Sequence, residues 1–116
     1  MTFEQFTVVK VPFPFTDRLA QKNRPALVLS TPERFNTLSG HSVMAMITTG
    51  AGAAWPLDCP LADLETAGLP TASLVRFKLF TLDHRLVRGE LGRLGDSDQA
   101  AVRAALETLI GTHNAG

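Results

Sequence analysis

The sequence predicts a mainly β fold, a small barrel or strongly bent sheet with one helix packed across it. Several short runs rich in β-branched and aromatic residues are separated by turns that contain glycine or proline. One segment, near the C-terminal end, places its apolar residues at helical spacing. Strands followed by a final helix are typical of such a fold. With 116 residues and 45% hydrophobic content, the chain is expected to form a single domain over residues 1–116.

The first two strands are expected to form a hairpin. Residues 7–13 are β-branched and aromatic, and prolines mark their end. Residues 16–23 are polar and charged, as in a hairpin loop. Pro25 is tolerated at the first position of a strand or on an edge, so the second strand should begin near Arg24.

The middle of the chain predicts further short elements. Residues 31–33 favour a single helical turn with proline near its start. The apolar run at 43–49 lacks alternation, which indicates a strand covered on both faces. Residues 55–57 predict the start of another short strand. Residues 73–82 alternate between polar and apolar, and residues 90–94 form a short strand bounded by glycines.

The C-terminal segment predicts a helix. Asp96 is a good N-cap, Gln99 follows three residues later as in a capping box, and Gly111 is a natural stop. The apolar stripe that should face the sheet consists of Ala101, Val102, Ala105, Leu106, Leu109 and Ile110.

Composition narrows the classes of function. The 11 basic and 11 acidic residues cancel, so nucleic-acid binding would need a local basic patch. Cys59 is the one cysteine, which excludes an internal disulfide and fits a reducing compartment. Signal-peptide and membrane-spanning patterns are absent, so we expect a cytoplasmic protein without membrane contact. Asp58, Cys59 and Asp63 lack the partners for a metal site, and we expect no metal and no cofactor.

Arg24 is the most unusual side chain of the sequence. Its permanent charge stands directly before Pro25 and an apolar run, where it is costly without a partner or a task. The planar guanidinium matches phosphate oxygens and stays charged at any relevant pH. The alternative is a structural arginine that pairs with Asp17 or Glu90.

An ordered set of short motifs resembles the MazF/PemK-like toxins of type II toxin–antitoxin pairs. Each motif alone is weak, and their order and spacing carry the resemblance. After the strand that ends at Phe13, with Pro14 and Thr16-Asp17, they are Asn23-Arg24-Pro25-Ala26-Leu27-Val28-Leu29-Ser30, Ile47-Thr48-Thr49, Ala67-Gly68-Leu69-Pro70, Ser73-Leu74-Val75-Arg76, Thr81-Leu82-Asp83 and Leu91-Gly92-Arg93-Leu94.

This resemblance implies a fold, an activity and partners. The fold would be an SH3-like small β-barrel of the MazF/PemK/CcdB type, normally a homodimer. The activity would be metal-independent endoribonuclease cleavage of single-stranded RNA, leaving 2′,3′-cyclic phosphate and 5′-hydroxyl ends. The partner would be a cognate antitoxin that blocks the RNA groove. The alternatives are a CcdB-like contact poison of DNA gyrase, or a degenerate inactive homologue. Two departures bear on activity: Phe6-Thr7 replaces a common Gly-Asp, and Lys78 replaces an aspartate that some members use in catalysis.

The resemblance places the catalytic arginine at Arg24 and the catalytic threonine at Thr48. Thr49 is the rival of Thr48 and otherwise a candidate for RNA contact. Adjacent strand residues face opposite sides, so we expect only one of the two in the site. The alternative is that both are ordinary strand formers at a strand end, which is the more frequent role of such threonines.

The remaining RNA-binding candidates are basic or aromatic. Arg76 and Lys78 share a strand face, and with Lys22 and Arg18 they would make the local basic patch; a solvated strand face is the alternative. Trp55 and Phe15 are candidates to stack on unpaired bases, or else pack in the core or a dimer interface.

The other aromatic and titratable residues have simpler expected places. Phe13, Phe77 and Phe80 are the better core candidates. The three histidines, His41, His84 and His113, are expected at the surface, and the sequence assigns no general acid or base.

Overall fold

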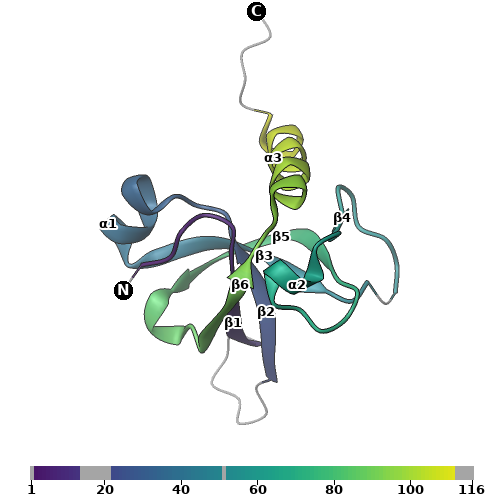
Figure 1. Cartoon of the computed structure of the whole chain (residues 1–116). Helices are drawn as coiled ribbons and strands as arrows, with labels where there is room; N and C mark the ends of the chain where they lie inside the picture. Colours follow the sequence, from purple (N-terminus) through teal and green to yellow (C-terminus); the bar gives the residue numbers. More distant parts are fainter. Residues whose placement is uncertain (1, 14–21, 51, 112–116) are drawn as a thin grey trace, which may run out of the picture.

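The computed structural model describes residues 2–13, 22–50 and 52–111. It is a curled six-stranded antiparallel sheet in the order β4-β5-β3-β2-β1-β6, with helix α3 packed against it (Figure 1). This confirms the predicted strongly bent, mainly β fold with a C-terminal helix; the curled sheet forms a half-barrel. The elements are β1 Thr7–Phe13, β2 Lys22–Val28, η1 Pro32–Asn36, α1 Thr37–Ser39, β3 His41–Thr48, β4 Cys59–Pro60, α2 Leu64–Ala67, β5 Leu74–Asp83, η2 His84–Leu86, β6 Gly89–Arg93 and α3 Asp96–Ile110.

Strand β2 begins earlier than the position of its proline suggested. It starts at Lys22 and pairs with β1 from Phe13 onward, whereas its ladder with β3 starts only at Ala26. Up to Pro25 the strand therefore has β1 alone as a partner, and the missing N–H of the proline is tolerated as on an edge.

The central strands β1, β2 and β3 carry buried residues on both faces, as the apolar run at 43–49 indicated for β3. One core cluster includes Val8, Leu27 and Ile47 and packs under α3 through Val102. The other includes Val9, Val11, Ala26, Val28 and Met44 on the opposite face, with Phe3 and Leu82. Burial on two sides explains why these strands show no polar alternation.

Several short elements differ from the expectations. The segment after β2 forms η1 and α1 rather than a single turn, although Pro32 does stand at its first position. Residues 55–57 do not begin a strand: Trp55–Asp58 is a turn, and β4 follows at Cys59. Helix α2, capped by Asp63, was not predicted because a four-residue helix leaves no periodic signal.

Helix α3 begins one residue away from the predicted cap. Gly95 is the N-cap and Asp96 is the first helical residue, so no side chain caps this end. Instead the buried carboxylate of Asp98 accepts hydrogen bonds from the backbone N–H groups of Ala62 and Asp63 at 2.9–3.1 Å. These bonds join the start of α3 to the segment before α2.

The predicted apolar stripe of α3 is buried only in its first half. Val102 is fully buried, Ala105 and Leu106 are partly buried, and Leu109 and Ile110 are exposed. Ala101, at the margin of the stripe, is exposed too. Figure 1 shows the reason: the helix points away from the sheet toward its C-terminal end. Within the described residues, no helix is long and apolar enough to cross a membrane.

Two glycines bring the segment after α2 close to β6. A Cβ atom on Gly68, whose φ is +75°, would lie 2.0 Å from the carbonyl oxygen of Leu91. A Cβ atom on Gly92 would lie 2.5 Å from the carbonyl oxygen of Thr66. Only glycine permits this approach, and it positions the following residues, Leu69 and Pro70, which line the hollow described next.

Candidate active site

Arg24 and Thr48 meet at one end of the sheet. The β2–β3 ladder ends at the pair Ala26–Met46, and Arg24 and Thr48 each lie two residues beyond that pair, at the same end of the sheet. Both line a hollow of about 180 Å³, here called the Arg24 hollow, with Thr49, Pro70 and Ser73 among its other walls.

The structure does not separate Thr48 from Thr49 as strictly as strand alternation predicts. Thr48 is the last residue of β3 and is partly buried, whereas Thr49 follows the strand and is exposed. Both line the Arg24 hollow, because alternation no longer holds beyond the end of the strand. Thr48 alone also lines the neighbouring hollow.

This neighbouring hollow, here called the Lys78 hollow, has a volume of about 330 Å³. Its walls are Phe13, Met46, Thr48, Arg76, Lys78, Leu79 and Phe80. The predicted residues Arg24, Thr48, Thr49, Arg76 and Lys78 are thus brought to two adjoining hollows that share Thr48. Their described lining residues include no carboxylate and no imidazole.

A bulge in β5 turns Lys78 outward. Met44 pairs with Phe80 but Met46 pairs with Arg76, so β5 uses four residues where β3 uses two. The two extra residues keep Arg76 and Phe80 on the same face, and they leave Lys78 and Leu79 exposed. A bulge beside a site commonly re-aims a side chain in this way.

Of the two ion pairs considered for Arg24, the one with Glu90 does not form. Arg24 is exposed, and its guanidinium lies 5.6 Å from the centroid of the Phe13 ring rather than against Glu90. Phe13 is correspondingly 36% exposed and is not the core residue that was expected. Asp17 lies outside the described residues. The described contact of the guanidinium is thus with an aromatic ring, and Arg24 lines the hollow.

Arg76 is held by a carboxylate. Its Nε and Nη2 atoms donate to Asp58 at 3.1 and 2.9 Å, and Nη2 also donates to the carbonyl oxygen of Ala53 at 3.3 Å. The pair is nearly buried, with side chains 13% and 15% exposed. The hydrogen bonds from Arg76 lower the pKa of Asp58, and those to Asp58 raise the pKa of Arg76. Sequence reasoning missed Asp58 because the partner lies 18 residues away.

Lys78 and Trp55 lie in contact. The Lys78 ammonium is 4.5 Å from the centroid of the Trp55 ring, and Trp55 is 42% exposed. Trp55 is therefore not a core residue. Of the first-loop candidates, Lys22 is exposed at the start of β2, on the same face as Arg24 by its spacing of two. Arg18 and Phe15 lie outside the described residues.

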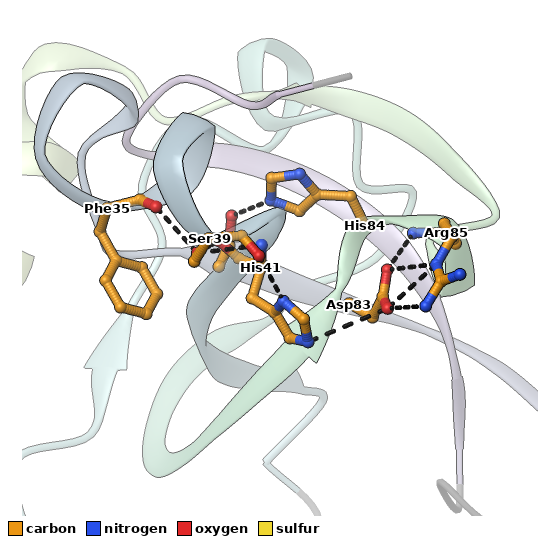
Figure 2. Close-up of polar contacts among 7 residues, drawn as sticks. Phe35, Ser39, His41, Asp83, His84 and Arg85 are labelled. Atoms are coloured by element: carbon orange, nitrogen blue, oxygen red, sulfur yellow. Dashed lines mark hydrogen bonds and ion pairs between the residues drawn. The ribbon is translucent and has the colours of Figure 1, made fainter.

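A third hollow, of about 400 Å³, lies at the opposite end of β3. Figure 2 shows that His41 and Arg85 both approach the carboxylate of Asp83. Arg85 donates to both oxygens of Asp83 at 2.7–3.1 Å, and His41 Nε2 lies 3.9 Å from Oδ2. The Arg85 hydrogen bonds hold the pKa of Asp83 well below its usual range.

The surface position that the sequence predicted for one histidine at this end was wrong. His84 is not a surface residue: it is 5% exposed, its Nε2 lies 2.7 Å from Ser42 Oγ, and its ring meets Phe3 edge-on. His41 is at the surface, as expected, and His113 lies outside the described residues. The periodicity of residues 83–87 is too short to reveal which side of η2 faces the core.

Neither the possible metal ligands nor the single cysteine among the described residues forms a reactive site. No three side chains of His, Cys, Asp or Glu converge there to hold a metal ion. Cys59 is buried, and burial raises the pKa of its thiol, which keeps it protonated and poorly nucleophilic. The chemistry available is a guanidinium and a hydroxyl in one hollow, which suits stabilisation of phosphate charge.

Comparison with known proteins gives a consistent family. The family model for PemK-like, MazF-like toxins of type II toxin–antitoxin systems matches residues 4–110. No match to the sequence was found among curated proteins.

Similar solved structures cover nearly the whole chain. A MazE–MazF structure from Deinococcus radiodurans has 23% identity and a TM-score of 0.76, covering 97% of this chain and 100% of the other. An endoribonuclease in complex with its cognate antitoxin, from a mycobacterial species, has 18% identity and a TM-score of 0.74, covering 97% of each chain. The Mycobacterium tuberculosis toxin MazF-mt6 has 18% identity and a TM-score of 0.70, covering 93% and 99%. At these identities the likeness concerns the fold.

Proposed function

Because the chain belongs to the PemK-like, MazF-like toxins of type II toxin–antitoxin systems, we propose that it is a metal-independent endoribonuclease. It cleaves single-stranded RNA to 2′,3′-cyclic phosphate and 5′-hydroxyl ends. The observation that carries the proposal is the arrangement of Arg24 and Thr48 in one hollow. One of the similar solved structures, from a mycobacterial species, is an endoribonuclease, which supports the same reaction.

The reaction needs three catalytic contributions at the scissile phosphate. The ribose 2′-hydroxyl must lose its proton and attack phosphorus, the pentacoordinate intermediate must be stabilised, and the 5′-oxygen must gain a proton as it leaves. Arg24 stabilises the pentacoordinate intermediate, because its guanidinium N–H groups donate to phosphate oxygens and its charge is permanent. Thr48 donates its hydroxyl to the phosphate or orients the 2′-hydroxyl.

The RNA strand follows the two hollows on either side of Thr48. Lys78 supplies positive charge at one hollow and Thr49 a hydroxyl at the other. Lys22, exposed two residues before Arg24 on β2, adds a further charge. Neutralising phosphates with lysine and arginine makes binding salt-dependent. These basic residues form the local patch that RNA binding requires, since the chain as a whole carries no net positive charge.

The partners we propose are a second copy of the chain and a cognate antitoxin. MazE–MazF structures from Deinococcus radiodurans and the mycobacterial complex with its cognate antitoxin are among the similar structures. The exposed apolar residues Leu109 and Ile110 of α3 are available for such contacts. The antitoxin would inhibit the enzyme by covering the RNA path.

The experiment is cleavage of a mixed-sequence single-stranded RNA by the purified chain in the presence of EDTA, with the cut ends mapped by primer extension. We expect discrete cuts with 5′-hydroxyl ends, which also supply the recognised sequence. Cutting that needs a divalent metal would overturn the metal-independent mechanism. No cutting by a folded protein would favour an inactive homologue or a contact poison, and binding to DNA gyrase would separate these two.

A further inference from the structure

The loop between β3 and β4 is tied to β5 by the carboxylate of Asp58. Besides the two hydrogen bonds from Arg76, Asp58 Oδ2 accepts one from the backbone N–H of Trp55 at 3.0 Å. The N–H of Asp58 donates back to the carbonyl oxygen of Trp55 at 3.2 Å. Arg76 also holds the carbonyl of Ala53. One ion pair thus fixes the backbone at Trp55 and two residues before it.

The indole of Trp55 is held in a fixed position although it is exposed. Its backbone is bound to Asp58, and the Lys78 ammonium lies 4.5 Å from the ring centroid. With 42% of the residue exposed, part of the ring remains open to solvent. A large aromatic surface with few free torsions is a low-entropy platform for a planar ligand.

The platform adjoins the candidate active site. Lys78 lines the Lys78 hollow together with Thr48, and Thr48 also lines the Arg24 hollow. A strand whose phosphate lies at Arg24 and Thr48 therefore passes Lys78 before it reaches Trp55. A cation beside an aromatic face is the usual combination for gripping an unpaired base and its phosphate.

We propose that Trp55 and Lys78 form a subsite for one unpaired nucleobase near the cleaved phosphate, and that the Asp58–Arg76 ion pair positions this subsite. The inference rests on the proposed function. The base stacks on the open part of the indole, and the Lys78 ammonium contacts the adjoining phosphate. Arg76 is then a positioning residue that acts through Asp58, rather than a ligand of the RNA backbone.

The arrangement favours nucleic acid over an acidic peptide. Lys78 alone would suit either ligand, but an indole fixed at its backbone adds a planar face that every unpaired base matches. Since the position of the indole depends on a single ion pair, the ion pair also influences which bases fit beside the cut.

Intrinsic fluorescence provides a direct test. Trp55 is the one tryptophan and the chain has no tyrosine, so the emission reports on this residue. The full chain is titrated with single-stranded RNA of about 15 nucleotides in which every 2′-hydroxyl is methylated. This strand binds without being cleaved, because the attacking hydroxyl is absent. Anisotropy of a dye-labelled copy measures binding independently.

We expect saturable quenching of Trp55 with the same midpoint as the anisotropy change. Trp55→Leu should weaken binding by roughly five- to hundredfold, the range for loss of one base–aromatic stack. Asp58→Ala and Arg76→Ala should each shift the emission of the free protein to longer wavelength and weaken binding. The double variant should be no weaker than either single variant, because the two side chains act as one unit.

Controls separate positioning from loss of fold. Asp63→Ala removes another turn-capping carboxylate, at α2, and should leave emission and affinity unchanged. If Asp58→Ala does not fold, Asp58→Asn weakens the ion pair while keeping a similar shape. In the cleavage assay, Asp58 variants should raise KM and broaden the set of cut sequences, with kcat changed by less than about threefold.

The outcomes distinguish this inference from the proposed function. Binding seen by anisotropy without quenching of Trp55 would overturn the subsite and leave the endoribonuclease proposal standing. Quenching that is unaffected in Asp58→Ala and Arg76→Ala would overturn the positioning role. Absence of binding would overturn the subsite, whereas the endoribonuclease proposal is decided separately by cleavage of unmodified RNA.

Discussion

The two ends of the β3–β5 pair are both hollowed, but they use their charged groups differently. At the His41 end, Arg85 and His41 approach one carboxylate, and the buried His84 is bonded to Ser42. At the Thr48 end, Arg76 is paired with Asp58, but the described contacts of Arg24 and Lys78 are with aromatic rings. The first hollow is larger, about 400 Å³ against about 330 and 180 Å³.

If the proposed function is right, neither the size of a hollow nor the presence of histidines marks the active site in this protein. About 23 Å of strand separates the two ends, from the rise per residue of an eight-residue strand. A charge that is already paired must give up its partner before it binds a ligand, whereas a cation resting on an aromatic ring keeps its donors for phosphate. We therefore assign structure to the His41 end and RNA chemistry to the Thr48 end.

The largest effect within this comparison, Arg24 aside, is expected at Thr48. Thr48→Ala should lower kcat by about a hundredfold, as for loss of one donor to transition-state charge. Thr48→Ser keeps the hydroxyl and should retain most of the activity. Thr49→Ala, its matched neighbour, should act mainly on KM. Equal losses for the two alanine variants, measured on the mapped RNA, would show that the strand face is assigned wrongly.

At the opposite end, His84→Ala should affect stability and not chemistry. Removing a buried ring and leaving Ser42 without its partner should cost about 2–3 kcal/mol of unfolding free energy. Urea unfolding measures this cost. Cleavage per folded molecule should remain at the wild-type rate, and a loss of activity in fully folded protein would contradict the division between the two ends.

Lys78 should carry a small, salt-dependent part of RNA affinity. Lys78→Ala should reduce the slope of log affinity against log salt by about 0.7, the value for one phosphate contact on a single strand. Arg34→Ala removes an exposed cation of η1, near the His41 end, and should leave the slope unchanged. Titrations at several salt concentrations test both, and equal slopes for all three proteins would remove Lys78 from the RNA path.

The smallest effect is expected from acid. The pKa values of Asp58 and Asp83 are lowered in the folded state by their arginine partners. Their stabilising contributions are therefore present above the ordinary carboxyl pKa of about 4, and are lost as the pH falls through the lower folded values. The free energy of unfolding of wild type and of Asp83→Asn is measured at pH 7 and at pH 3. Wild type should be the more stable at pH 7, and the difference should shrink at pH 3. A difference that grows on acidification would contradict the sign of the shift.

The sequence was sufficient for the fold, and several of the residues it singled out lie together at the Thr48 end, where their roles stay predictions. Periodicity and turn residues identified the longer strands and α3, because these depend on burial over many residues, but they did not identify the two-residue strand β4. The charge before Pro25 singled out Arg24, which the structure places exposed at the edge of the Arg24 hollow; its catalytic role stays a prediction. The Asp58–Arg76 pair was not foreseen, because it depends on how β4 approaches β5. The burial of His84 was missed because η2 is three residues long, and the exposed end of α3 because a stripe does not tell where a helix leaves the sheet.

The most direct test of the central assignment compares two exposed arginines at opposite ends of the sheet. Arg24→Ala and Arg85→Ala are assayed on the same RNA with EDTA, after circular dichroism has shown both variants folded. We expect Arg24→Ala to lose at least about a thousandfold in cleavage rate, as for removal of a charged transition-state donor, and Arg85→Ala to cut at the wild-type rate. Two results would contradict the account: a folded Arg24→Ala variant that cleaves RNA at the wild-type rate, or cleavage that is lost in Arg85→Ala and kept in Arg24→Ala.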